Sequence, residues 1–292
     1  MPDDTGGRDL APGVLTEYLD EDSGIFVRST REFERFRSPY QSVEVHDTRP
    51  FGKLFRLDGH FMTSEKDEFF YHENLVHVAA ITHPAPETAL IIGGGDGGSA
   101  EELLKYPTMK SVTLVEIDVA VIDIARKYFG EIHRGALSDP RLKLSVDDGL
   151  RFVQATGNSF DLIVLDLTDP GGPSEPLYGA DFYRACAARL NPSGAMTLHV
   201  ASPISHPARI RKGIANLRAA FAVVTPYLTS IPLYGGLWMM ACASSTLNPA
   251  ALSVLEADRR IATRRIRDLR YYNGEVHRAS FALPNFVRDL VV

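Results

Sequence analysis

The chain has 292 residues, of which 45% are hydrophobic, and its formal net charge at neutral pH is −6. This length allows one large domain, or a main domain with a smaller one, around a sizeable core. The acidic balance provides no electrostatic footprint for nucleic acid, so we expect no such partner. It suits a small cationic substrate instead.

Neither a membrane protein nor a secreted one is expected. The sequence has no apolar run near the roughly 20 residues of a membrane span, and residues 1–12 are too polar for a secretory signal. The only cysteines, Cys186 and Cys242, lie in apolar contexts without the spacing of a redox motif. We therefore expect a cytoplasmic protein with reduced cysteines, and disorder over residues 1–12.

Residues 13–62 carry the signals of a small antiparallel β domain. Short alternating segments, separated by turn residues, predict strands at 24–28, 42–46 and 53–57. From residue 63 the apolar period changes to that of a helix, which we expect over residues 63–80. The second expected domain, residues 63–292, begins with this helix.

The stretch from Thr88 to Asp118 predicts strand, glycine turn, helix and strand. The glycine-rich turn, residues 93–98, follows one apolar run, and a second apolar run ends at Glu116. Glycine lets a ligand lie against the backbone, and the free N–H groups of a helix N-terminus favour negative charge. An acid about 20 residues beyond such a turn is placed to bind ribose hydroxyls.

The glycine spacing alone leaves the ligand open. Gly93, Gly95 and Gly98 satisfy G-x-G-x-x-G, so NAD, FAD and S-adenosyl nucleotides all remain candidates. Asp96, inside the turn, would repel a pyrophosphate but attract an amine or a sulfonium. We therefore favour an S-adenosyl ligand, with a tight turn and a solvated aspartate as the alternative.

Helices and strands alternate through the rest of the larger domain. Further helices are predicted at 120–128, 150–154, 180–190 and 207–221, and further strands at 142–146, 160–165, 195–199, 223–228 and 238–244. This alternation predicts an α/β fold with a doubly wound parallel sheet. Ligands of such sheets bind outside the carboxyl ends of the strands.

Five acids fall at those strand ends, namely Asp96, Glu116, Asp148, Asp166 and Asp169. Each alone would suit a loop or a helix N-cap, but together they would repel one another unless a cation enters. An adenosyl ligand would use Glu116 for the ribose, Asp148 for the adenine amino group and Asp96 for a cationic tail. Asp166 and Asp169 remain for a second molecule, and a carboxylate beside an amine can accept its proton. The residues alone thus suggest alkyl transfer from an S-adenosyl donor to an amine. The scattered histidines predict no metal site.

Several motifs together resemble the spermidine synthase family of polyamine aminopropyltransferases. They are Ser38–Gln41, Asp67–Glu73, Gly93–Gly98, Val115–Asp118, Asp147–Gly149, Asp166–Pro173 and the tail from Tyr271 to Phe286. The resemblance implies a Rossmann-like domain of the class I S-adenosylmethionine-dependent transferase type, a small N-terminal β domain, and a homodimer or homotetramer. It also implies decarboxylated S-adenosylmethionine as a co-substrate rather than a cofactor, an amine acceptor such as putrescine or another polyamine, and release of 5′-methylthioadenosine.

The resemblance also assigns roles to individual positions. Its donor-binding positions fall on Gln41, His72, Asp96, Glu116, Asp147 and Asp148. Asp166 falls on the position of the base, with Tyr71 and Tyr234 near it, and the acceptor side falls on Asp169, Tyr234 and Trp238. Without the resemblance, Tyr71 would be assigned to the core and His72 to the surface.

The sequence departs from the family pattern mainly on the acceptor side. His199 and Ala201 stand where a glutamine or glutamate and a nearby acid are usual, Leu167 replaces a hydroxyl residue, and residues 233–236 form a shortened loop. On the donor side, Glu101-Glu102 replaces Arg-Glu. A lost buried carboxylate would weaken binding of a distal ammonium by about 1–3 kcal/mol. We therefore expect that putrescine is not the best acceptor.

Two alternatives remain open. A methyltransferase would use S-adenosylmethionine itself, whose carboxylate Asp96 would repel. A non-catalytic nucleoside- or polyamine-binding protein would need no base such as Asp166.

Overall fold

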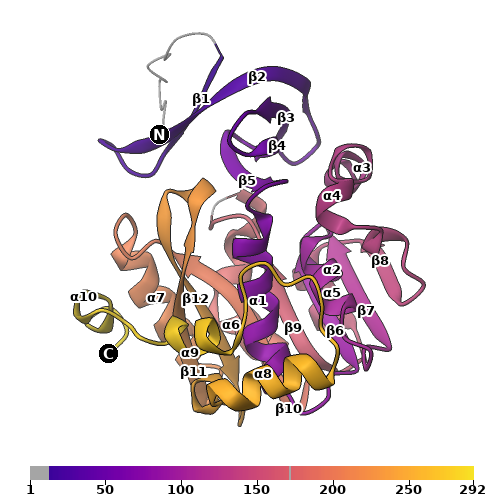
Figure 1. Ribbon diagram of the computed structural model, residues 1–292, viewed down its shortest axis with the longest axis vertical. Helices are drawn as coiled ribbons and strands as arrows, with labels where there is room; N and C mark the ends of the chain where they lie inside the picture. The colour runs from indigo at the N-terminus through magenta and orange to yellow at the C-terminus, as the bar shows by residue number, and fades with distance from the viewer. Residues whose placement is uncertain (1–12, 171) are drawn as a thin grey trace.

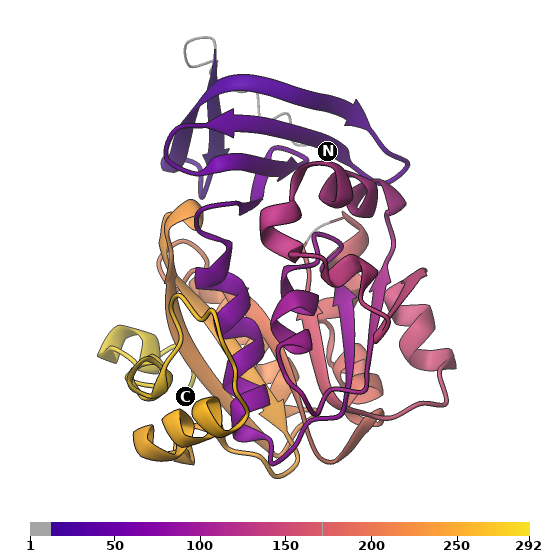
Figure 2. The same ribbon diagram turned by 45° about the vertical axis from the view of Figure 1, so that its right-hand side comes forward.

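The computed structural model describes residues 13–170 and 172–292 and contains two sheets. The disorder expected over residues 1–12 lies outside the described residues. Figure 1 shows the smaller sheet across one end of the molecule and the larger sheet, with its helices, below it. Figure 2 shows the same arrangement from a second direction.

The smaller sheet is antiparallel, with strands in chain order, as expected for this part of the chain. Its strands are β1 (Val14–Tyr18), β2 (Gly24–Arg37), β3 (Ser42–Thr48), β4 (Gly52–Leu57) and β5 (His60–Ser64). The inner face of β3 and β4 is apolar and packs against Phe129 and Ile132. This contact fixes the small sheet against the helical layer of the larger one.

The helix expected over residues 63–80 begins later, because Thr63 and Ser64 belong to β5 and pair with β4. Helix α1 (Glu68–Thr82) is buried around nearly its whole circumference. It contacts α2, α8, β10 and β11, and it runs through the middle of the molecule in Figure 1. A helix that is buried on all sides has no solvent-exposed polar face. The spacing of its apolar residues therefore does not show which side chains point toward the site.

The larger sheet has the order β11-β12-β10-β9-β6-β7-β8. Its strands are β6 (Thr88–Gly93), β7 (Ser111–Glu116), β8 (Leu142–Val146), β9 (Phe160–Asp166), β10 (Leu190–Ala201), β11 (Val223–Ile231) and β12 (Gly236–Ser244). All neighbouring pairs from β10 to β8 are parallel, as expected. The strand order reverses between β6 and β9, which is where doubly wound sheets bind ligands.

Strand β12 departs from the expected parallel arrangement, since it runs antiparallel to both β10 and β11. A short loop, residues 232–235, joins β11 to β12 and contains the 3₁₀ turn Pro232–Tyr234. A parallel connection needs a crossover of a dozen or more residues, so this loop permits only a hairpin.

Successive residues of the central strands face opposite layers of helices. In β6, Ala89 and Ile91 belong to the core that contains α1, whereas Leu90 and Ile92 belong to the core on the other face. The helices that complete the layers are α2 (Gly98–Leu104), α3 (Val119–Tyr128), α4 (Gly130–His133), α5 (Gly149–Ala155), α6 (Ala180–Ala187) and α7 (Pro207–Arg218). The expected helices are thus all present, though most are shorter than expected. Cys186 and Cys242 are free and buried.

The C-terminal helices α8 (Val254–Thr263), α9 (Gly274–Ser280) and α10 (Asn285–Arg288) were not anticipated from the sequence. Glu73 of α1 binds the C-terminal tail and is 1% exposed. Its carboxylate accepts hydrogen bonds from three backbone N–H groups of the tail, those of Arg270 (2.7 Å), Tyr271 (2.9 Å) and Tyr272 (2.7 Å). Arg264 donates to the carbonyls of Ala80 and His83 at the end of α1. These bonds satisfy backbone groups that a buried helix end would otherwise leave unpaired.

Replacing Glu73 with glutamine tests this anchor. The amide nitrogen cannot accept a hydrogen bond, so a buried N–H loses its partner and the free energy of unfolding should fall by about 1–3 kcal/mol. Urea unfolding measures the change, and Glu21→Gln, at an exposed position, serves as the control. Equal stability of the two variants would contradict the anchor.

Candidate active site

The site lies at the reversal of strand order, where β6 and β9 end side by side and Gly93 pairs with Asp166. A cavity there is lined by residues from both sheets and from α1. Among them are Gln41, Met62, Tyr71, His72, Gly93, Asp96, Glu116, Asp148, Asp166, Leu177 and Tyr234. The structure therefore brings together most of the residues that the sequence singled out, from seven separate segments.

Two glycines of the turn are required by close approaches. Gly93 has a φ of +79°, and a Cβ built on it would lie 2.1 Å from the carbonyl oxygen of Asp166. A Cβ on Gly98 would lie 2.2 Å from the ring of His72. Because these two glycines have no side chain, β9 and α1 can approach the turn closely. Asp96, which lies between the two glycines, is thereby brought near both elements.

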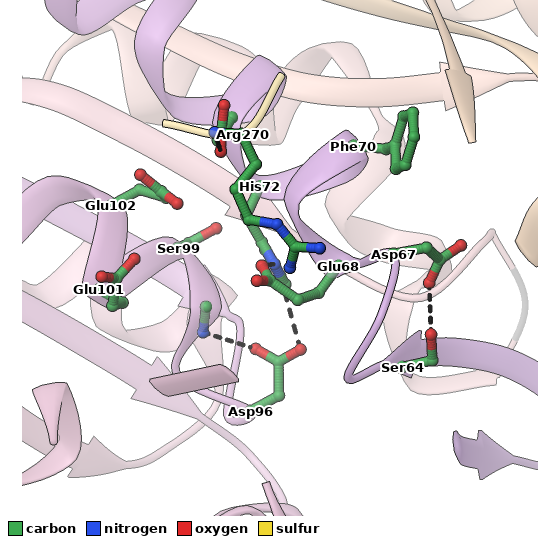
Figure 3. Close-up of polar contacts among 12 residues, drawn as sticks. Ser64, Asp67, Glu68, Phe70, His72, Asp96, Ser99, Glu101, Glu102 and Arg270 are labelled. Atoms are coloured by element: carbon green, nitrogen blue, oxygen red, sulfur yellow. Dashed lines mark hydrogen bonds and ion pairs between the residues drawn. The ribbon is translucent and has the colours of Figure 1, made fainter. Parts of the chain in front are cut away.

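Asp96 faces a buried histidine (Figure 3). His72 is 2% exposed, with Nε2 3.5 Å from Asp96 Oδ2 and Nδ1 3.0 Å from Glu68 Oε2. Burial alone would lower the pKa of His72, but Asp96, Glu68 and Asp166 outweigh it and raise the pKa well above its usual range. Burial opposes ionisation of Asp96, yet His72 and the Gly98 N–H hold the pKa of Asp96 below its usual value. The charged histidine therefore compensates buried carboxylates.

Asp166, at the end of β9, shares this environment. Its Oδ2 accepts a hydrogen bond from Ser99 Oγ at 2.7 Å and lies 3.9 Å from His72 Nε2. Burial, reinforced by the nearby charge of Asp96, raises the pKa of Asp166 to about 6. A carboxyl group with a pKa near neutrality is suited to proton transfer. Ser99 was not selected from the sequence, because its contact with Asp166 is purely tertiary.

His72, Asp96 and Asp166 also form a geometric candidate for a metal site. One ligand atom from each residue lies within 4.8 Å of the others. Sequence spacing missed this group because the three residues come from α1, the glycine turn and β9. A metal could bind only after His72 lost its proton. An organic ammonium needs no such loss and fits the same acidic group.

Glu116 lines the cavity from the end of β7 and is 7% exposed. Its carboxylate accepts hydrogen bonds from the N–H groups of Asp118 (2.9 Å) and Gly95 (3.3 Å). Burial raises the pKa of Glu116 to about 7. Gln41 reaches the same region from the small sheet, and its amide donates to Asp118 Oδ2 at 3.0 Å. Asp118, which sequence reasoning did not select, thus joins the two sheets at the cavity wall.

The two consecutive aspartates after β8 have different surroundings. Asp148 lines the cavity and caps α5 by accepting from the N–H of Arg151 at 2.9 Å. Asp147 is not among the lining residues, and its carboxylate is bound by Arg151 Nε at 2.8 Å. The sequence could not separate these neighbours, since both follow the same strand.

A smaller cavity adjoins the first one and contains the acceptor-side residues Asp169, Tyr234 and Trp238, together with His199. Asp169 Oδ2 accepts a hydrogen bond from Arg209 Nη1 at 2.6 Å, so this acid already has a cationic partner. Tyr234 lines both cavities, and its ring lies 5.3 Å from Trp238 and 5.9 Å from Tyr71. Ala201 is fully buried at the end of β10.

Glu101 and Glu102 lie outside the cavity lining, on α2 (Figure 3). Glu102 is 2.8 Å from His77 and 2.7 Å from Lys105, and Glu101 is 3.4 Å from Arg134. Arg134 also reaches Glu68 at 3.2 Å. This departure from the family pattern therefore belongs to a charge network behind His72.

Comparisons with known proteins agree with this geometry. The sequence matches the spermine/spermidine synthase domain over residues 68–253. It is 48% identical to the polyamine aminopropyltransferase of Nitrosomonas europaea, covering 97% of this chain and 87% of that protein. It is 40% identical to that of Moorella thermoacetica, covering 95% of each.

Solved structures give the same result. A spermidine synthase in complex with the transition-state analogue AdoDATO matches with a TM-score of 0.90 and 34% identity, covering 97% of this chain and 96% of that one. Spermidine synthase from Thermotoga maritima matches with a TM-score of 0.87 and 33% identity, covering 97% and 95%. The predicted Rossmann-like α/β fold with its N-terminal antiparallel sheet is confirmed.

The predicted family is confirmed as well, and with it the expectation of a transferase. The chain belongs to the spermine/spermidine synthase family and is an aminopropyl-transferring enzyme of polyamine biosynthesis.

Proposed function

We propose that the chain moves the aminopropyl group of decarboxylated S-adenosylmethionine to an amine and releases 5′-methylthioadenosine. The observation that carries this proposal is the convergence of Asp96 and Asp166 on one buried histidine at the end of β6 and β9. Such a pair of acids provides one site for the donor's ammonium and one base for the acceptor.

The donor would lie along the carboxyl ends of β6, β7 and β8. In this pose Glu116 holds the ribose hydroxyls and Asp148 the adenine amino group, with Gln41 closing the wall through Asp118. Asp96 receives the primary ammonium of the aminopropyl arm. S-adenosylmethionine would bring a carboxylate to the same place, so electrostatics disfavour the methyltransferase alternative. Asp147, bound to Arg151, has no part in this pose.

Asp166 would accept a proton from the acceptor amine. The nitrogen lone pair then attacks the carbon beside the sulfonium, the new C–N bond forms, and the C–S bond breaks with its electron pair going to sulfur. Because the sulfonium is already a good leaving group, the protein contributes mainly position and proton acceptance. A non-catalytic binder would have no use for this base.

The acceptor side supports an amine other than putrescine as the preferred substrate. Asp169 is already paired with Arg209, and His199 and Ala201 stand at positions where the family pattern has polar or acidic residues. A second ammonium would therefore find little uncompensated negative charge there. Binding of such an ammonium should be weaker by about 1–3 kcal/mol than against a free buried carboxylate.

Assembly, cellular location and domain division complete the proposal. We infer a cytoplasmic homodimer or homotetramer that needs no cofactor beyond its co-substrate and binds no nucleic acid, in keeping with the net charge of −6. No helix among the described residues is long and apolar enough to cross a membrane. The division into residues 13–62 and 63–292 remains a proposal, with β5 ending at Ser64.

Asp166→Asn tests the base. The amide still accepts from Ser99 but cannot take a proton, so transfer should slow by about 10²- to 10⁴-fold while the donor binds normally. Mass spectrometry of methylthioadenosine measures the rate, and calorimetry measures donor affinity. Asp181→Asn, at an exposed acid on α6, is the matched control. Full activity of Asp166→Asn would remove Asp166 from the mechanism.

The raised pKa of Asp166 predicts a pH dependence. Below about pH 6 the carboxyl group is protonated and cannot act as a base, so kcat/KM for the donor should fall as the pH drops through this value. Ser99→Ala removes a hydrogen bond that lowers this pKa, and should shift the fall toward higher pH. Ser159→Ala, at an exposed position, should leave the profile unchanged. An identical profile for Ser99→Ala would assign the ionisation to another group.

Arg209→Gln tests the acceptor side. Without the guanidinium, Asp169 is free to bind a distal ammonium, so KM for putrescine should fall by up to about tenfold, which corresponds to about 1.4 kcal/mol. A panel of amines with the decarboxylated donor, read by mass spectrometry, measures the acceptor preference. Arg211→Gln, an exposed arginine on the same helix, is the control. Strong turnover of putrescine by the unaltered enzyme at micromolar KM would reject the proposed preference.

A further inference from the structure

His199 lines the smaller cavity and contacts three polar side chains. It is 5% exposed and lies on β10. Its Nδ1 is 3.1 Å from the hydroxyl of Tyr71, and its Nε2 is 2.7 Å from the hydroxyl of Tyr178. Nε2 also lies 3.6 Å from Asp169 Oδ1. Both ring nitrogens are therefore engaged, in a residue that the proposed mechanism does not use.

The partners of the ring determine its tautomer. Tyr178 has one hydroxyl proton, and the carbonyl oxygen of Thr168, 2.8 Å away, can only accept it. Nε2 must then carry a proton and donate to Tyr178, an arrangement that the carboxylate of Asp169 also favours. Burial lowers the pKa of His199, although the charge of Asp169 opposes the shift, so the ring is neutral. Nδ1 is consequently unprotonated and accepts the hydroxyl proton of Tyr71.

This arrangement gives the hydroxyl of Tyr71 a fixed direction. Burial, and then the charge of Asp166, raise the pKa of Tyr71 well above its usual range, so the phenol keeps its proton. Asp166, on the cavity side, is a second hydrogen-bond partner of this hydroxyl, so two acceptors compete for its one proton. When His199 holds the proton, the Tyr71 oxygen turns its lone pairs toward Asp166 and the cavity. Two hydrogen-bond acceptors then face the cavity, and a group with several N–H bonds satisfies both.

We propose that His199 is a positioning residue that holds the Tyr71 hydroxyl as a hydrogen-bond acceptor for the attacking amine beside Asp166. The inference rests on the proposed function and adds a determinant of how the acceptor is oriented. The chain Thr168–Tyr178–His199–Tyr71 transmits this orientation from the backbone after β9 to the reacting nitrogen. If His199 were absent, Tyr71 would turn its proton toward Asp166 and compete with the amine for the base.

A glutamine at position 199 could fulfil the same role. A carboxamide, like the neutral imidazole, offers one acceptor and one donor at its end. Phenylalanine fills a similar volume but offers neither. Comparing His199→Gln with His199→Phe therefore separates the hydrogen-bonding role of this side chain from its packing.

The test is a double-mutant cycle on amine-dependent methylthioadenosine formation, with His199→Phe, Tyr71→Phe and the combined variant. Each single change should lower kcat/KM for the amine by about tenfold to a hundredfold. Because His199 acts through the Tyr71 hydroxyl, the combined variant should be no more than about threefold worse than Tyr71→Phe alone. His199→Gln should stay within about threefold of the unaltered enzyme. Losses that multiply in the combined variant, or a His199→Gln as poor as His199→Phe, would overturn the inference.

Two further measurements distinguish failure of this inference from failure of the proposed function. Thr197→Val, a buried change two residues away on β10 with no hydrogen-bond partner lost among the described residues, should leave kcat/KM unchanged. Donor affinity, measured by calorimetry, should be the same in all these variants. If the unaltered enzyme forms no methylthioadenosine with any amine, the proposed function fails. If it is active and His199→Phe matches it, only the inference fails.

Discussion

The compensation of buried negative charge at one edge of the larger sheet is the constraint on which this structure depends. Asp96 and Asp166 would repel each other without a cation, and His72 supplies one from α1, where Glu68 holds its second nitrogen. An unpaired charge in such a position would cost several kcal/mol. The protein therefore carries its own cation at the place where the proposed substrates bring theirs.

The fold serves this charge arrangement. The strand order reverses between β6 and β9, so the glycine turn and Asp166 lie side by side, and the missing side chain of Gly98 makes room for the ring of His72. Helix α1 carries His72 into the site in its second turn and is held at its other end by Arg264. The small sheet closes the cavity through Gln41, which binds Asp118. The larger sheet, α1 and the small sheet thus each contribute residues to the lining of the cavity.

The sequence was most informative where local patterns determine structure. Alternating apolar runs predicted the parallel strands, and the acids after them predicted where ligands bind. Periodicity could not place His72 or reveal the burial of its neighbours, because α1 is enclosed on all sides and has no polar face. Ser99 and Arg209 were missed because their partners, Asp166 and Asp169, lie far away in the chain. The direction of β12 depended on loop length, which the apolar pattern does not encode.

The two cavities differ in how their acids are balanced, and this difference bears on acceptor choice. In the smaller cavity each acid has its own basic partner, with Arg209 on Asp169 and His60 3.1 Å from Glu17. In the larger cavity His72 is shared between two acids, and the hydrogen bonds to Glu116 from the described residues come from backbone N–H groups. A cation therefore gains more from the larger cavity than from the smaller one. Recognition of the acceptor beyond its reacting nitrogen then depends more on the aromatic wall of Tyr234 and Trp238 than on charge, so acceptors should differ mainly in how well their carbon chains fit that wall.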